Sequence, residues 1–150
     1  MRTQLARELP YTPEQVFSLV SDIAKYPQFV PWVAGLRTWN GRTDADGVHW
    51  VDAEVQVGFA MLRERFSTRV RLDPGQLQID ADLLSGPFKH LKNRWIFEAV
   101  PGGTRVNFDI DFQFKSPVLD GLLSRNMDTA ISRLIACFDD RARALFREPD

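Results

Sequence analysis

A chain of 150 residues, 44% hydrophobic and 26% charged, is long enough to fold as one domain around one sizeable core, here expected to span residues 1–150. Its net charge of −1 argues against a protein that coats a nucleic-acid backbone, so no DNA partner is expected. The single cysteine, Cys137, excludes an internal disulfide framework, and no apolar run reaches the roughly 20 residues that span a bilayer, so a cytoplasmic protein is expected.

The first elements are a strand and a capped helix. Residues 3–9 are expected to form a short strand, after which Thr12 and Gln15 have the spacing of a capping box at a helix start. The apolar helical period that follows should end near Lys25, because Pro27 disfavours helical geometry in the residue before it. The segment YPQFVPW is therefore expected to be an irregular exit from the helix.

Residues 34–114 alternate between apolar and polar side chains and are divided by Gly- and Pro-containing turns. This period of two predicts an antiparallel meander of five or six strands with one apolar and one solvated face. Turns near Gly58, at DPGQ (73–76) and at PGG (101–103) then pair opposite charges across neighbouring strands. The expected pairs are Glu54 with Arg65, Arg69 with Asp80, Lys92 with Asp111, Arg94 with Asp109, and Glu98 with Arg105.

The last part of the chain changes to a helical period. Apolar residues spaced by three or four positions continue from Leu119 to Leu145, which predicts one unbroken helix. At 1.5 Å per residue this helix would be roughly 40 Å long, enough to cross the apolar face of the meander.

Chemistry-bearing motifs are lacking. The two histidines, His49 and His90, and Cys137 have no metal-ligand spacing, and the sequence holds no phosphate-binding glycine loop or GxSxG motif. We therefore expect no catalytic residue, no metal and no cofactor, and Cys137 is interpreted as a buried, inert thiol.

Three polar residues fall on the apolar face by parity. Glu64, Thr68 and Asn93 are expected to point inward, where burial without a partner costs about 1–3 kcal/mol each. They would meet a polar head group in a cavity, or alternatively Glu64 would reach water at a strand end and Asn93 would bond to a loop or helix end.

Two surface features keep alternatives open. The row Arg63, Arg65, Arg69 and Arg71 points outward, either as an attractive surface for RNA, acidic lipid or acidic protein, or as a solvated ladder of ion pairs. The apolar turn GFAML (58–62) is a lid over an opening, an edge that contacts a membrane or partner, or a tip folded over the core.

Four segments together resemble a known family. These are TPEQVFSLVSDIAKYPQFVPW (12–32), SGPFKHLKNRWIF (85–97), RVNFDIDFQF (105–114) and IACFDDRARALF (135–146). The chain resembles the coenzyme Q-binding protein and ribosome association toxin branch of the START superfamily, also described as polyketide cyclase-like. This resemblance implies an α+β helix-grip fold like that of the birch pollen allergen. In that fold a curved antiparallel meander wraps around a long C-terminal helix, with two short helices after the first strand.

The resemblance also implies a function. It implies non-catalytic binding of a lipophilic ligand, ubiquinone (coenzyme Q) above all or a similar isoprenoid lipid, between sheet and helix, in support of respiration. A peripheral contact with the inner membrane is left open. One alternative is a toxin-like regulator that binds the large ribosomal subunit through the outward arginines. A weaker one, a polyketide cyclase or aromatase, rests on the shared fold alone.

Site residues follow from the resemblance and from the inward faces. Tyr26, Phe29 and Trp32 would form a rigid aromatic wall at one end of the cavity, or plug that end as ordinary core. Phe88 and Leu91 would line the entrance, and Trp95 would lie deeper. The full expected binding set is Tyr26, Phe29, Trp32, Leu62, Glu64, Phe66, Phe88, Leu91, Asn93, Trp95, Phe108, Met127 and Ile131.

Overall fold

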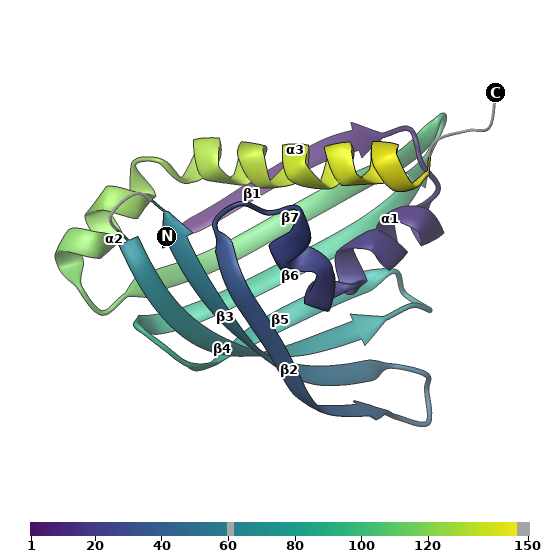
Figure 1. Ribbon diagram of the computed structural model, residues 1–150. Coiled ribbons are helices and arrows are strands. Elements are labelled where there is room, and N and C mark those ends of the chain that lie inside the picture. The colour runs from purple at the N-terminus through teal and green to yellow at the C-terminus, as the bar shows by residue number, and fades with distance from the viewer. Residues whose placement is uncertain (60–61, 147–150) are drawn as a thin grey trace.

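Seven strands form one antiparallel sheet in the computed structural model, which describes residues 1–59 and 62–146. The strand order is β1-β7-β6-β5-β4-β3-β2, so the six strands after β1 form the expected meander (Figure 1). The strands are β1 (Arg2–Leu9), β2 (Val33–Thr43), β3 (His49–Phe59), β4 (Leu62–Asp73), β5 (Gln78–Ser85), β6 (Phe88–Val100) and β7 (Gly103–Phe114).

The helices between β1 and β2 follow the sequence signals closely. In α1 (Pro13–Ser21) the Thr12 hydroxyl accepts from the Gln15 amide N–H at 3.1 Å, and the Gln15 side chain accepts from the Thr12 N–H at 3.0 Å. The α-helix ends at Ser21, before Lys25, and a 3-10 helix η1 (Ile23–Gln28) takes over. The two short helices expected after the first strand are therefore confirmed, with a 3-10 helix as the second.

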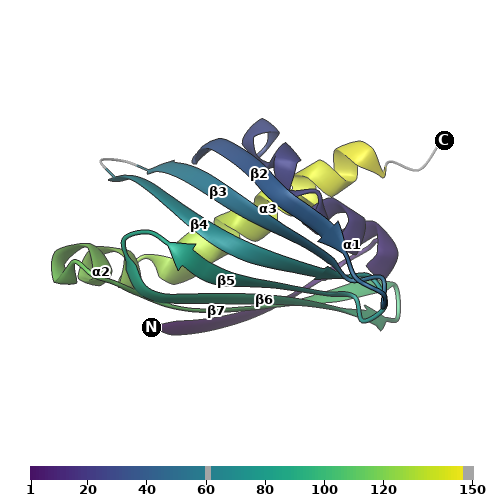
Figure 2. The same cartoon turned by 90° about the horizontal axis from the view of Figure 1, so that it is seen from below.

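The apolar face of the sheet curves around the C-terminal helix. Figure 2 shows the strands in front of α3 (Met127–Leu145) and the sheet curving from β1 and β7 toward β2. The buried positions of α3 follow the helical period, namely Ile131, Ile135, Phe138 and Ala142. These side chains join the buried strand residues in one core cluster, so the expected α+β arrangement of sheet and gripping helix is confirmed. Among the described residues no helix is long and apolar enough to cross a membrane.

The single long helix expected over 119–145 is wrong in one respect, because the structure divides it. A short helix α2 (Pro117–Ser124) is capped by the Ser116 hydroxyl and is separated from α3 at Arg125–Asn126. The Asn126 side chain donates to the Leu122 carbonyl at 3.0 Å, and its backbone N–H donates to the Leu123 carbonyl at 3.1 Å. These local bonds replace the regular helical ladder. The 19 residues of α3 are therefore roughly 28 Å long.

The expected strand register is right for one hairpin and wrong for two. Across β6 and β7 the expected pairs Lys92–Asp111, Arg94–Asp109 and Glu98–Arg105 lie opposite each other. Between β3 and β4, however, Arg65 lies opposite Gln56 and meets Glu54 only diagonally, at 3.7 Å. Between β4 and β5, Arg69 lies opposite Asp82, and Arg71 lies opposite Asp80. Both errors are shifts of two positions, which leave every side chain on its expected face.

Candidate functional site

An aromatic cluster fills the inner face near α1 and η1. Phe138 of α3 lies at its centre, with ring centroids 5.2 Å from Tyr26, 5.3 Å from Phe29 and 5.4 Å from Trp95. Phe108 packs edge-on against Trp95 at 4.7 Å. The Tyr26 hydroxyl donates to the Val20 carbonyl, and burial raises the pKa of this phenol well above its ordinary value. Tyr26 and Phe29 thus belong to this cluster as packed side chains that close one end of the inner face.

A second cluster lies at the other end of the inner face, near α2. Phe88 stacks on Phe114 with centroids 4.4 Å apart and meets Phe66 edge-on at 5.3 Å. Leu91 and Phe112 complete the buried part of this cluster. The structure therefore divides the expected binding residues between two groups. Ile110 and Met127 contact both clusters.

Burial along the inner face changes from one end to the other. Near α1, the inward side chains of the middle strands are buried, for example Ala53 at 2% and Ile79 at 3% exposure. Near α2, inward apolar side chains of the same strands are only half-buried. We call this second group, with the helix residues that face it, the half-buried region: Val55, Val57, Glu64, Phe66, Leu83, Leu123 and Met127. Sequence reasoning missed Val55, Val57, Leu83 and Leu123 as site residues, although the alternation over residues 34–114 is consistent with Val55 and Val57 on the apolar face.

The three inward polar residues have different partners. The Asn93 side chain donates to the Asp109 carbonyl at 3.0 Å and accepts from the Trp95 indole N–H at 2.8 Å. Thr68 is buried at 5% exposure. Glu64 is half-buried and forms no hydrogen bond or ion pair with any residue that the structure describes. Among the described residues the Thr68 hydroxyl also has no hydrogen-bond partner, so Glu64 differs from Thr68 in being a half-buried, charged group.

The other residues of the expected binding set are Ile131, Trp32 and Leu62. Ile131 is buried at 3% exposure in the main core. Trp32 is half-buried, and its carbonyl accepts from the Gly58 N–H at 2.8 Å. The side chain of Leu62 and the tip residues 60–61 of the GFAML turn lie outside the described residues, so the alternatives for this turn stay predictions.

The outward arginine row is largely paired with carboxylates. Arg69 donates twice to Asp52, at 3.0 and 3.3 Å, and Arg71 donates to Asp73 at 3.0 Å. The bond from Arg69 lowers the pKa of the Asp52 carboxyl, although burial partly opposes it. Arg63 is exposed and has no carboxylate partner among the described residues. Arg65 pairs with Glu54 at 3.7 Å, so the ladder of ion pairs is confirmed for Arg65, Arg69 and Arg71.

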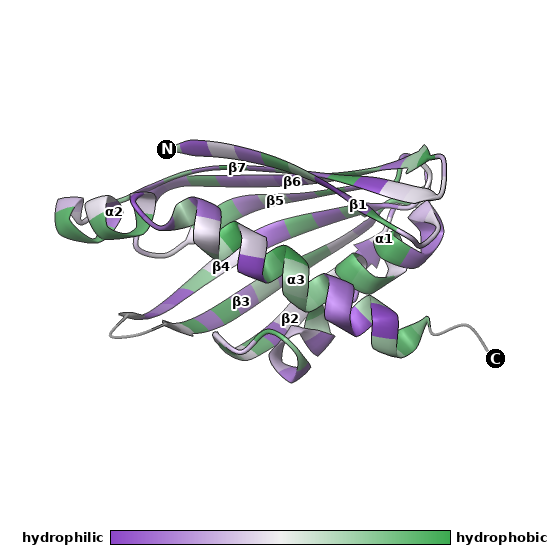
Figure 3. Cartoon of the chain, turned by 90° about the horizontal axis from the view of Figure 1, so that it is seen from above, coloured by the Kyte–Doolittle hydropathy of each residue, from purple (hydrophilic) through white to green (hydrophobic). Residues whose placement is uncertain are grey.

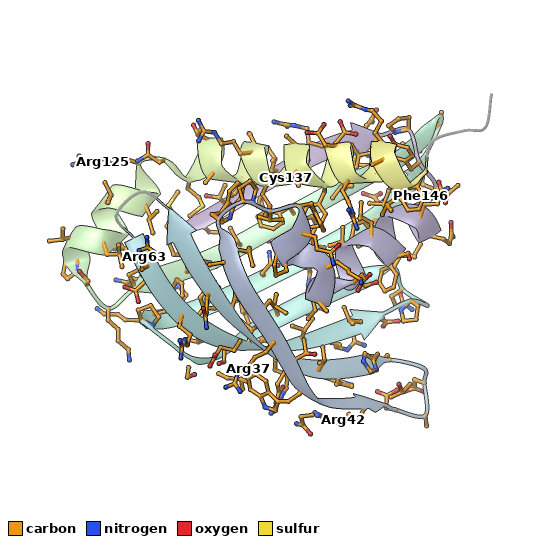
Figure 4. The ribbon with its side chains drawn as sticks, viewed as in Figure 1. Arg37, Arg42, Arg63, Arg125, Cys137 and Phe146 are labelled. Atoms are coloured by element: carbon orange, nitrogen blue, oxygen red, sulfur yellow. The ribbon has the colours of Figure 1, made fainter. Side chains whose placement is uncertain are left out.

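The structure places two more arginines on the outer face, beyond the row from Arg63 to Arg71 that was expected from the sequence. Arg37 lies over the Trp39 ring, 5.2 Å from its centroid, and Arg42 lies 5.8 Å from the Trp50 ring. Arg37 and Arg42 lie along β2, on the opposite side of the molecule from Cys137 on α3 (Figure 4).

Burial raises the pKa of the Cys137 thiol, which disfavours the reactive thiolate.

Two of the hollows formed by the described residues lie outside the half-buried region. The larger, about 520 Å³, is on the outer face, and its charged groups pair with one another, as in Arg94–Asp80 at 2.6 Å and Arg2–Asp109 at 2.8 Å. The smaller, about 240 Å³, lies between α1, η1 and α3 beside Phe29 and Arg141. The larger hollow is lined mostly by charged groups, which do not suit a lipid tail, whereas the smaller one has the apolar Leu19, Phe29, Leu145 and Phe146 beside four polar or charged side chains. Within residues 1–59 and 62–146, no group of His, Cys, Asp or Glu side chains is arranged to hold a metal ion.

A curved meander around a gripped C-terminal helix defines a helix-grip fold, which the chain shares with a solved START superfamily protein of Mycobacterium smegmatis at 24% identity and a TM-score of 0.78. The sequence agrees with this class. The chain belongs to the polyketide cyclase / dehydrase and lipid transport family, whose model matches residues 9–139.

Relatives in this family have different names. The chain is 34% identical over 147 residues to the ribosome association toxin RatA of Rickettsia prowazekii, covering 96% of this chain and 97% of that one. It is 33% identical over 141 residues to the mitochondrial coenzyme Q-binding protein coq10 of Schizosaccharomyces pombe, covering 92% and 84%. Among solved structures, an 18 kDa protein of Caulobacter crescentus is 53% identical, with a TM-score of 0.85 and 99% of each chain covered.

Proposed function

We propose that this protein binds ubiquinone, or a similar isoprenoid lipid, on the inner face of its sheet and carries it without chemical change. One observation carries the proposal: on the middle strands β3, β4 and β5, the inward apolar side chains near α2 are half-buried, whereas those near α1 are packed. A core completed by protein alone would bury both ends. A tail laid along Val57, Phe66 and Leu83 would cover this surface and gain about 25 cal/mol per Å² of apolar area, less the cost of ordering.

The expected binding residues divide by role under this proposal. Phe66 and Met127 belong to the half-buried region and would contact the tail. Trp95 and Phe108 are buried beneath α3 at 6% and 5% exposure, so they would form the floor of the site. Glu64 would meet the polar head, since Asn93 already has protein partners for its oxygen and its nitrogen.

The proposal is tested first on protein purified from its native host without detergent. Organic extraction followed by mass spectrometry is expected to release ubiquinone in near-stoichiometric amount. An extract of folded protein that holds no isoprenoid quinone contradicts the assignment of the ligand.

A pair of neighbouring leucines tests the place of binding. Leu83 is half-buried on the inner face, and Leu84 is 43% exposed on the other face of the same strand. An indole at position 83 would occupy space that the tail needs, so Leu83→Trp is expected to weaken binding of a short-chain ubiquinone at least tenfold. Leu84→Trp, a matched control, is expected to bind as the wild type does. Equal affinity of the two variants, with unchanged circular dichroism, would contradict this site.

A second candidate function, association with the large ribosomal subunit, is favoured by a separate observation. Arg42 and Arg63 are exposed on the outer face and form no ion pair within 4 Å among the described residues. Arg37, which is paired with Glu54 at 3.2 Å, stacks on Trp39, which is 40% exposed. Cations beside an exposed aromatic ring suit contact with RNA phosphates and bases. The relative from Rickettsia prowazekii, which is named a ribosome association toxin, lends this candidate support.

Charge reversal tests this second candidate. The variant Arg42→Glu with Arg63→Glu is expected to lose co-sedimentation with the large subunit, and wild-type binding should weaken steeply with salt. Lys25→Glu with Arg133→Glu changes the net charge equally on other surfaces and is the control. Equal co-sedimentation of both double variants would exclude this face as the contact.

A further inference from the structure

One face of α2 carries two exposed apolar side chains between two cations. Val118 is 83% exposed and Leu122 is 56% exposed, and their spacing of four places them side by side on the helix. Lys115 lies two residues before the first residue of α2, and Arg125 is the C-terminal cap of the helix, so one cation lies at each end of this face. We name this surface, Lys115, Val118, Leu122 and Arg125, the α2 face. Figure 3 shows α2 with hydrophobic residues at the end of the molecule opposite the C-terminus.

The other side of α2 is already occupied. Leu119 and Leu123 pack against the cluster around Phe88. Asp120, the acidic residue of α2, accepts from the Phe114 N–H at 3.0 Å, which holds its carboxylate at the end of β7. The side chains of Lys115 and Arg125 have no carboxylate partner among the described residues. The α2 face therefore combines unpaired positive charge with apolar side chains that are mostly exposed to solvent.

We propose that the α2 face docks the protein on the surface of a bilayer that contains anionic lipids. Two apolar side chains flanked by cations suit the interface of such a membrane, where the aliphatic groups enter the acyl boundary and the cations meet the headgroups. A stable protein partner would require roughly 800 Å² from this side, far more than a valine and a leucine supply. In Figure 4 Arg63 on β4 lies at the same end of the molecule as Arg125, which adds a further cation there.

The position of α2 beside the half-buried region supports a bilayer as the partner of the α2 face. Leu123, on the opposite side of α2 from the α2 face, belongs to that region, so docking through α2 would bring the half-buried region within one helix of the bilayer surface. In this respect the inference rests on the proposed function, because a carrier of a membrane lipid must take it from a membrane. Docking itself is measured without any quinone, so the two proposals are tested apart.

Flotation with quinone-free vesicles tests the docking. Vesicles of phosphatidylcholine with about 30% phosphatidylglycerol are expected to bind the wild-type protein, and Val118→Ser with Leu122→Ser is expected to lower partitioning at least tenfold. Leu145→Ser, at an exposed leucine at the far end of α3 with 53% exposure, is the control and should partition as the wild type does. Both apolar sites are exposed, so the double variant is expected to fold normally.

The charge of the α2 face is tested separately. Lys115→Gln with Arg125→Gln is expected to lower partitioning onto phosphatidylglycerol vesicles about tenfold or more and to change partitioning onto pure phosphatidylcholine little. Lys25→Gln with Arg133→Gln is the matched control for net charge. An equal loss in both charge variants would overturn the role assigned to this face, since it would report only the total charge.

Other outcomes overturn the proposal as a whole. Wild-type protein that does not float, or a Val118→Ser, Leu122→Ser variant that floats like the wild type, excludes the α2 face as a membrane contact. A wild-type dimer in sedimentation velocity that this variant converts to a monomer assigns the face to a second copy instead. Binding of short-chain ubiquinone in vesicle-free buffer should be unchanged in the variant. Wild-type protein that floats through this face but binds no quinone would support the docking surface and contradict the proposed ligand.

Discussion

Asp52 and Arg69 form a two-pronged ion pair across β3 and β4, with Arg69 Nε 3.0 Å from Asp52 Oδ1 and Nη2 3.3 Å from Oδ2. Asn40 donates to the same carboxylate at 3.2 Å from the bulge in β2. The pair joins three strands on the outer face, where Asp52 is only 4% exposed. This carboxylate therefore ties the far edge of the sheet to its middle.

Removing the charge of Asp52 should weaken this connection. Asp52→Asn is expected to lower the free energy of unfolding by about 1–2 kcal/mol at pH 7, because a charge-assisted bond is lost while Arg69 can still reach water. Urea unfolding followed by circular dichroism measures the change. Asp46→Asn, in the exposed turn between β2 and β3, is the control and should remain within about 0.5 kcal/mol of the wild type. A loss of similar size in the control would contradict a specific role for the ion pair.

Lowering the pH should remove the contribution of the Asp52–Arg69 ion pair to the stability of the wild-type protein. The bond from Arg69 lowers the pKa of Asp52 in the folded protein, so its stabilisation is fully present above the unfolded value of about 3.9. It is lost as the pH falls through the lower, folded value. The difference in unfolding free energy between wild type and Asp52→Asn is therefore expected to narrow below about pH 4. A difference that stays constant from pH 7 to pH 2 would show that the effect of the substitution is not electrostatic.

A close backbone contact explains why glycine occupies position 103. A Cβ atom placed there would lie 2.0 Å from the Leu9 carbonyl oxygen and 3.0 Å from Pro10 Cα. Both are backbone atoms of the segment that leads from β1 to α1, so neither moves without displacing that connection. Gly103→Ala is expected to cost roughly 3 kcal/mol or more, seen as a lower melting temperature.

Gly121 provides the matched control for that substitution. No atom lies within 4 Å of a Cβ placed at Gly121, and the residue is in the exposed part of α2. Gly121→Ala is expected to leave stability unchanged or to raise it by up to about 1 kcal/mol, since alanine favours helix. A Gly103→Ala variant as stable as Gly121→Ala would show that the chain between β1 and α1 adapts easily.

Sequence periodicity could predict the face of each strand residue but not the register of each hairpin. Alternation depends on side-chain polarity, whereas register depends on loop geometry. At the β4–β5 turn, Asp73 accepts from the Gln76 N–H at 3.0 Å, and Leu77 adopts a left-handed φ of 54°. Left-handed backbone is uncommon for leucine, so sequence reasoning centred the turn on Pro74 and Gly75 and missed the longer loop.

The candidate site shows the same division between what is predictable and what is not. Phe66, Leu91 and Trp95 lie on the inner face, as alternation predicted. How far α3 covers them depends on the break at Asn126, and asparagine within a helical period gives no clear signal of a break. The difference between a packed end and a half-buried end was therefore visible only in the structure.

The free carboxylate of Glu64 leads to a prediction about the redox state of the proposed ligand. A carboxylate can only accept hydrogen bonds. The carbonyls of a quinone can also only accept, so they cannot bond to it, whereas the hydroxyls of a quinol can donate to it. Bound at Glu64, the quinol form would gain a charge-assisted bond that the quinone form lacks. Glu64→Gln replaces this acceptor with an amide that also donates. It is therefore expected to lower the affinity for a short-chain ubiquinol about tenfold and to leave the affinity for the matching ubiquinone unchanged or raise it.

Fluorescence titration of both forms under anaerobic conditions measures the ratio of the two affinities, and Glu8→Gln, at an exposed position on β1, is the control. An unchanged ratio of the two affinities in Glu64→Gln would place the head group elsewhere on the inner face.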